Sequence, residues 1–83
     1  MRLLYFAWLK QKIGHSEEEV TLPEGVKNVE ELLQWLAGRG ENYAAALSDP
    51  KAVRVAVNQE YARPADPVKN DDEVALFPPV TGG

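Results

Sequence analysis

One stretch of the sequence carries a strong helical pattern, and it lies between segments that alternate with the period of a β-strand. Asn28 and Glu31 have the spacing of a capping box, which predicts that a helix begins there. Four apolar residues then fall on one helical face: Val29, Leu32, Leu33 and Leu36. Gly38 and Gly40 end the pattern. The chain is therefore expected to form one sheet with one main helix packed on a single face.

The segments around this helix predict the strands. Residues 2–9, RLLYFAWL, are apolar at almost every position, which indicates a central strand followed by a short turn at residues 10–14. Residues 17–22 and 53–57 alternate between polar and apolar side chains, and residues 73–77 form the last strand. A short edge strand is expected around Tyr61. Whether residues 41–48 form a second, shorter helix stays open.

Alternation along the first strand divides its side chains between the two faces of the sheet. The helix side receives Leu3, Tyr5, Ala7 and Leu9, and the other side receives Leu4, Phe6 and Trp8. One helix cannot cover both faces, so an apolar group containing Phe6, Tyr61 and Phe77 is expected to stay exposed, as docking surfaces do. The alternative is that residues 41–48 or the loop from 58 to 72 cover this face.

The composition excludes several classes of function. The 83 residues include no cysteine and one histidine, which excludes disulfides and thiol nucleophiles and argues against a zinc site. A net charge of −4 with nine scattered basic residues argues against nucleic acid and favours a basic protein surface as the partner. The apolar run at residues 3–9 is far shorter than the roughly 20 residues that span a membrane. We therefore expect no membrane contact and a cytoplasmic location.

No segment inside the predicted fold has the pattern of a catalytic site. The sequence shows no Ser, His and Asp set and no phosphate-binding glycine loop. The acidic runs Glu17–Glu19 and Asp71–Glu73 are interpreted as solvated surface, and His15 as an exposed loop residue. Trp35 lies off the apolar stripe of its helix and is interpreted as partial core.

The C-terminal residues, FPPVTGG, are the part of the sequence whose pattern suggests a reactive group. Pro78 and Pro79 favour extended backbone, so residues 78–83 are predicted to form an extended, flexible tail on a domain of residues 1–77. Gly82 and Gly83 lack a Cβ and can enter a narrow channel in another protein. The group delivered there is the terminal carboxylate, which is ionised and inert until an enzyme activates it. Without cysteine, sulfur can be carried only on that group, as a thiocarboxylate.

The order of elements is strand, strand, helix, strand, strand. This order resembles the β-grasp of ubiquitin, an α+β fold with a mixed sheet of four to five strands and one main helix on one face. In that fold the first and last strands lie side by side in the middle of the sheet, which suits the apolar RLLYFAWL and VALF segments. A ferredoxin-like sandwich needs a second good helix and is the runner-up.

Two longer stretches resemble a known family. AVNQEYARPADPVKNDDEVALFPPVTGG is similar to the C-terminal third of MoaD-type molybdopterin synthase small subunits, and LLYFAWLKQKIG is similar to their first strand and turn. FPPVTGG is the most specific element, because a terminal Gly-Gly alone also occurs in thiamine-pathway sulfur carriers and in ubiquitin. The chain departs from the family at Asn70, Asp71 and Asp72, where the family often has Asp-Gly-Asp, and this affects local turn geometry only.

The resemblance implies a sulfur carrier subunit of molybdopterin synthase. An E1-like enzyme that consumes ATP would adenylate Gly83, and sulfur transfer would give a thiocarboxylate. With Gly82, this end would enter the large subunit and donate sulfur to cyclic pyranopterin monophosphate, forming the dithiolene of molybdopterin. Two small and two large subunits would assemble, with the catalytic residues on the large ones and no cofactor bound permanently to this chain.

The resemblance also implies a set of interface positions: Phe6, Tyr61, Phe77, Pro78, Pro79, Val80 and Thr81. Two alternatives share the fold and the tail. One is a sulfur carrier of the thiamine pathway, and the other is a ubiquitin-like protein modifier.

Overall fold

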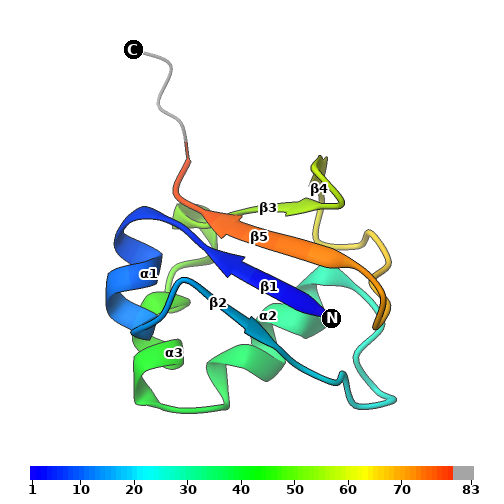
Figure 1. Cartoon of the computed structure of the whole chain (residues 1–83), viewed down its shortest axis with the longest axis horizontal. Helices are drawn as coiled ribbons and strands as arrows, with labels where there is room; N and C mark the ends of the chain where they lie inside the picture. The colour runs from blue at the N-terminus through cyan, green and yellow to red at the C-terminus, as the bar shows by residue number, and fades with distance from the viewer. Residues whose placement is uncertain (80–83) are drawn as a thin grey trace.

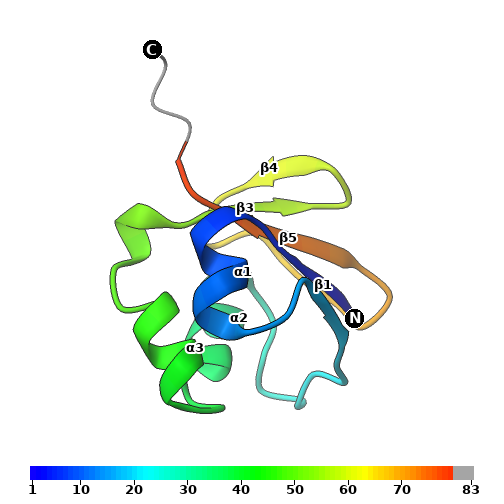
Figure 2. The ribbon, with the colours of Figure 1, turned by 60° about the vertical axis from the view of Figure 1, so that its left-hand side comes forward.

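The computed structural model describes residues 1–79 of the 83-residue chain. Five strands form one mixed sheet in the order β2-β1-β5-β3-β4, and the helices gather on one side of it (Figures 1 and 2). The elements in chain order are β1 (Arg2–Tyr5), α1 (Ala7–Ile13), β2 (Glu17–Glu19), α2 (Val29–Ala37), α3 (Glu41–Ala46), the 3₁₀ helix η1 (Pro50–Ala52), β3 (Arg54–Val57), β4 (Glu60–Ala62) and β5 (Glu73–Phe77).

The first and last strands pair in parallel at the centre of the sheet, as predicted. Leu3 lies opposite Val74 and Tyr5 opposite Leu76, and β5 pairs on its other side with β3 in antiparallel orientation. The expected β-grasp arrangement is confirmed. The open question about residues 41–48 is also settled, because α3 forms over Glu41–Ala46. It packs against α1 and α2. The ferredoxin-like alternative does not apply, because the sheet has five strands in the order β2-β1-β5-β3-β4.

The strand predicted over residues 2–9 is wrong beyond Tyr5. Ala7, the first residue of α1, has a φ of 55°, which turns the chain out of the sheet and into the helix. Leu9 and Ile13, one helical turn apart, are both buried, so the apolar residues predicted as strand form the buried face of a helix. The turn predicted at residues 10–14 is the second half of α1, and Gly14 ends it at a φ of 103°.

This change alters the predicted division of side chains between the faces. Leu3 and Tyr5 lie in the core and Phe6 is exposed, as expected. Ala7 was placed on the helix side of the sheet but is exposed, and Trp8 packs half-buried against the core from α1. Leu9 is buried as predicted, but a helix places it there and not a strand.

The remaining elements lie close to their predicted bounds. At the start of α2 the Glu31 N–H donates to Asn28 Oδ1 at 2.8 Å, as the predicted N-cap requires. Glu31 Oε1 reaches one residue further back than in a capping box and accepts the Lys27 N–H at 2.9 Å. β2 is shorter than predicted and ends at Glu19. Leu22 is buried beyond it, where its N–H donates to Asn70 Oδ1 at 2.8 Å and no strand is needed.

The core lies between the sheet and the helices. Its largest fully buried side chains are Leu3, Tyr5, Leu9, Leu32, Leu36, Val74 and Leu76. Burying such a side chain stabilises the fold by roughly 1.5–3 kcal/mol. Trp35 is half-buried against this core, as its position off the apolar stripe predicted. With one face of the sheet covered in this way, the other face remains available.

Candidate functional site

The sheet face away from the helices carries an apolar band across four strands. The pairing places Leu4, Ala75, Ala56 and Tyr61 in one row, on β1, β5, β3 and β4. Phe77 lies opposite Arg54 one step further along, and the Phe6 N–H donates to the Leu76 carbonyl at 3.1 Å beside it. Charged residues surround this band, including the ion pair of Arg2 with Glu17 at 2.7 Å. We call Leu4, Phe6, Ala56, Tyr61, Ala75 and Phe77 the open face.

Two large apolar side chains of the open face are strongly exposed. Phe6 retains 48% and Tyr61 79% of its accessible surface, whereas Phe77 is half-buried. The Tyr61 and Phe77 rings lie 5.9 Å apart between centroids, so they form one aromatic surface. Neither α3 nor the loop after β4 covers Phe6 and Tyr61, so the predicted exposure is confirmed for these two side chains but not in full for Phe77. Its part in binding stays a prediction.

The described chain leaves the sheet next to this aromatic surface. β5 ends at Phe77, and Pro78 and Pro79 follow it, both half-buried. A strand cannot continue through two prolines, because neither has an N–H to donate to the strands on either side. Val80, Thr81, Gly82 and Gly83 lie outside the described residues. Their predicted roles, and the division into a domain and a tail, therefore stay predictions.

A polar cluster on the helix side was missed by the sequence reasoning. The Tyr5 and Tyr43 hydroxyls donate to Glu18 Oε2 at 2.7 and 2.6 Å, and Arg39 Nη1 donates to Oε1 at 2.8 Å. His15 Nε2 lies 3.1 Å from both Glu18 Oε2 and the Tyr43 hydroxyl. The interpretation of Glu17–Glu19 as a solvated run is wrong for Glu18, because a β-strand turns every second side chain to the same face.

The pKa shifts in this cluster show that its hydrogen bonds favour a charged Glu18 and neutral tyrosines. Burial acts to raise the pKa of Glu18, but hydrogen bonds from Tyr43, Tyr5, Arg39 and His15 lower it to about 2. Burial and the bond to Glu18 raise the pKa of Tyr43 to about 12, and the same two causes raise that of Tyr5. At neutral pH the Glu18 carboxylate is therefore charged, and both tyrosines are neutral hydrogen-bond donors to it.

Residues 1–79 contain no group of three or more His, Cys, Asp or Glu side chains that could hold a metal ion. Among the same residues, no helix combines the length and apolar character needed to cross a membrane.

The chain matches the family model described as the ThiS family over residues 3–83. It belongs to the ThiS family. Among curated proteins it is 39% identical to the molybdopterin synthase sulfur carrier subunit of Escherichia coli (strain K12), with 100% of this chain and 99% of that protein covered. The subunit of the same name from Haemophilus influenzae is 37% identical, with the same coverage of both chains. The family resemblance predicted from the sequence is confirmed.

Solved structures of this kind agree with the fold. A putative molybdopterin converting factor, subunit 1, from Pyrococcus furiosus superposes with a TM-score of 0.76 at 32% identity, covering 95% of each chain. SAMP1 from Haloferax volcanii superposes with a TM-score of 0.74 at 29% identity, covering 100% of this chain and 98% of that one. The ThiS-family chain thus has the β-grasp body of both kinds of protein.

Proposed function

We propose that this chain is the sulfur carrier subunit of a molybdopterin synthase. The observation that carries the proposal is the length of the match. Relatives with that name align with the whole of this chain and 99% of their own length. The family match also runs through residue 83, so the Gly-Gly end is part of it together with the β-grasp body.

The chemistry of the carrier takes place at the carboxylate of Gly83. That carboxylate attacks the α-phosphate of ATP on an E1-like activating enzyme, and pyrophosphate leaves. A sulfur nucleophile then attacks the acyl-adenylate, AMP leaves, and a thiocarboxylate remains. The absence of cysteine supports this route, because the sequence offers no thiol on which sulfur could travel.

The loaded end then acts inside a partner. Relatives named as subunits imply a second, larger subunit, and a complex of two small and two large subunits is part of the proposal. The open face supports docking beside the tail, since Phe77 belongs to this face and directly precedes Pro78 and Pro79. The large subunit supplies the catalytic residues that move sulfur onto cyclic pyranopterin monophosphate, in the cytoplasm.

Reconstitution from purified components tests this function. The chain is incubated with its activating enzyme, ATP and a sulfur donor, and its intact mass should rise by about 16 Da as sulfur replaces oxygen. Adding the large subunit and the pterin precursor should then yield molybdopterin. A variant that lacks Gly82 and Gly83 is the control. Molybdopterin formation with that variant would contradict the proposal.

A protein modifier is the second candidate function, because the similar structure from Haloferax volcanii is also titled small archaeal modifier protein 1. Its signature would be isopeptide-linked conjugates of Gly83 with lysines of other proteins. Mass spectrometry of cells that express a tagged chain would detect them. A thiamine-pathway carrier would instead support thiazole formation when thiazole synthase replaces the large subunit.

A further inference from the structure

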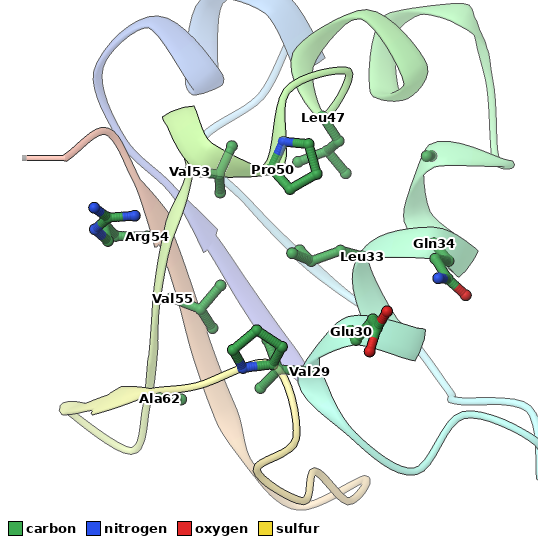
Figure 3. Close-up of a pocket in the computed structure, with 12 residues that line it drawn as sticks. Val29, Glu30, Leu33, Gln34, Leu47, Pro50, Val53, Arg54, Val55 and Ala62 are labelled. Carbon is green, nitrogen blue, oxygen red and sulfur yellow. The ribbon is translucent and has the colours of Figure 1, made fainter.

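An apolar groove opens on the helix side of the sheet, between α2 and the β3–β4 edge (Figure 3). It encloses about 410 Å³. Its apolar lining consists of Val29, Leu33, Ala37, Leu47, Val53 and Val55, with further contributions from Ala62 and Pro64. No step of the proposed sulfur transfer uses this groove. A volume of this size is in the range of ligand-binding clefts, so the groove is large enough to hold side chains of a binding partner.

At this groove the pairing of β3 with β4 stops at Val55, so the chain just before β3 has no partner on β4. Val55 pairs with Ala62, the last residue of β4, so continuing the register sets Val53 opposite Pro64. Pro64 has no N–H, and its own carbonyl accepts the Glu30 N–H at 2.9 Å. The Asn58 N–H donates to Glu73 on β5, so odd-numbered residues of β3 turn their main-chain groups toward the β4 side. Val53 precedes β3 in extended conformation, and its N–H donates to the Pro50 carbonyl at 3.3 Å. Continuing the alternation of β3 by one residue turns the Val53 carbonyl toward the edge where β4 supplies no donor.

One carboxylate, Glu30, lies at the rim of the groove where α2 begins, and the cation Arg54 lines the β3 side. Glu30 and Gln34 are its polar side chains on the α2 wall, and both are exposed (Figure 3). Glu30 forms no ion pair with any residue between 1 and 79. An extended peptide with a Lys or Arg near one end suits this arrangement, because it can place apolar side chains in the groove, a main-chain N–H at Val53 and its cation at Glu30.

The groove is continuous with the open face around the short edge strand. Arg54, Val55 and Ala62 line the groove, and the same three residues line a shallow depression that contains Tyr61 and Phe77. β4 is only three residues long, so little structure separates the two surfaces. A partner that holds Tyr61 and Phe77 can therefore reach around β4 into the groove.

We propose that the groove receives an extended apolar segment of the large subunit, with a Lys or Arg of that segment at Glu30. This inference rests on the proposed function, because it assumes that the large subunit docks on the open face. It adds a second surface on the opposite side of the sheet. The large subunit then holds the β3–β4 edge from both sides.

Methyl NMR on the full chain in complex with its large subunit tests the proposal. Signals of Leu33, Ala37 and Val53 should shift when the unlabelled large subunit is added, together with those of Leu4 and Ala75 on the open face. Shifts confined to Leu4 and Ala75 would overturn the groove proposal and leave the carrier function standing. Absence of any complex would overturn both. Groove shifts that grow with concentration in the chain alone would assign the groove to a second copy and also overturn it.

Two charge-reversal variants, one at the groove and one away from it, test the role of Glu30 by their affinity for the large subunit. Glu30 and Glu41 are both exposed and both lie in the first turn of a helix, so Glu30→Lys and Glu41→Lys carry the same helix-dipole cost. Glu30→Lys should weaken the complex by about fivefold or more, and Glu41→Lys by less than about twofold. Sulfur loading by the activating enzyme should be equal in both variants. Equal affinities for the large subunit would show that no cation meets Glu30 and would overturn the proposal.

Discussion

The Tyr43 hydroxyl donates a 2.6 Å hydrogen bond to the Glu18 carboxylate, which ties α3 to the edge strand β2. Glu18→Gln keeps the shape of the side chain but removes its charge, so the bonds from Tyr5, Tyr43 and Arg39 weaken. We expect a loss of about 2 kcal/mol in the free energy of unfolding, measured by denaturant titration. The exposed neighbour gives the control, since Glu19→Gln should change the same quantity by less than about 0.5 kcal/mol.

The same carboxylate predicts a dependence of stability on pH. The pKa of Glu18 is lowered in the folded state to about 2 from a reference of 4.5, so the unfolded chain binds the proton more readily. Its contribution is complete above about pH 4.5 and is lost as the pH falls toward 2. The difference in unfolding free energy between the natural chain and Glu18→Gln should therefore shrink steadily from pH 5 to pH 2. A difference that stays constant over this range would contradict the assigned role.

The turn between β3 and β4 predicts a stabilising substitution. Asn58 and Gln59 have φ values of 51° and 71°, and two positive values in a two-residue loop are typical of a type I′ hairpin. Gln59→Gly removes the steric cost of a side chain there and should raise the free energy of unfolding by about 0.5–1 kcal/mol. Asn58→Gly should lower it, because the Asn58 side chain bonds both Asp72 and the Glu73 N–H. Thermal unfolding of both variants checks the opposite signs.

The positive φ of Ala7 predicts that a glycine there does not destabilise the protein. A φ of 55° is costly for any residue with a Cβ, by about 1–2 kcal/mol. Ala7→Gly removes this strain, so its melting temperature should equal or exceed that of the natural chain despite the added backbone entropy. Ala44→Gly, at an exposed position inside α3, should instead cost about 1 kcal/mol. If Ala7→Gly lost as much as Ala44→Gly, the left-handed conformation at Ala7 would be wrong.

A substitution at Tyr61 distinguishes an effect on binding from an effect on folding stability better than one at Phe77. Tyr61 is 79% exposed, so Tyr61→Ala should leave the melting temperature almost unchanged. If the open face docks the large subunit, the same variant should weaken the complex by about 2 kcal/mol in calorimetry. Phe77→Ala should reduce both quantities, because its ring is half-buried. Unchanged affinity in Tyr61→Ala would place the docking surface elsewhere.

The elements that the sequence predicted well are those whose signals are local. The helix start at Asn28 and the five-residue strand before Pro78 depend on neighbouring residues, and both were found with nearly the right bounds. α1 was missed because an apolar run suits a strand and a buried helix equally, and because an alanine at Ala7 gives no warning of a positive φ.

The features that escaped prediction depend on distant residues. Glu18 resembles its exposed neighbours Glu17 and Glu19 until Tyr43, 25 positions away, is brought to it by the fold. By contrast, the exposure of Phe6 and Tyr61 could be predicted, because side chains alternate along a strand and one helix covers only one face of the sheet. The groove depends on where Pro64 meets the start of α2, which no local pattern encodes.

The parallel pairing of β1 with β5 sets the time at which the protein can fold during synthesis. β5 occupies the centre of the sheet, between β1 and β3, although it comes almost last in the 83 residues. While the ribosome still holds Val74 and Leu76, β1 and β3 have no strand to join them, and the hydrophobic core stays incomplete. Folding must therefore wait until β5 has emerged, as for other topologies dominated by distant contacts. An activating enzyme that recognises the folded body would accordingly meet only chains whose synthesis has passed β5.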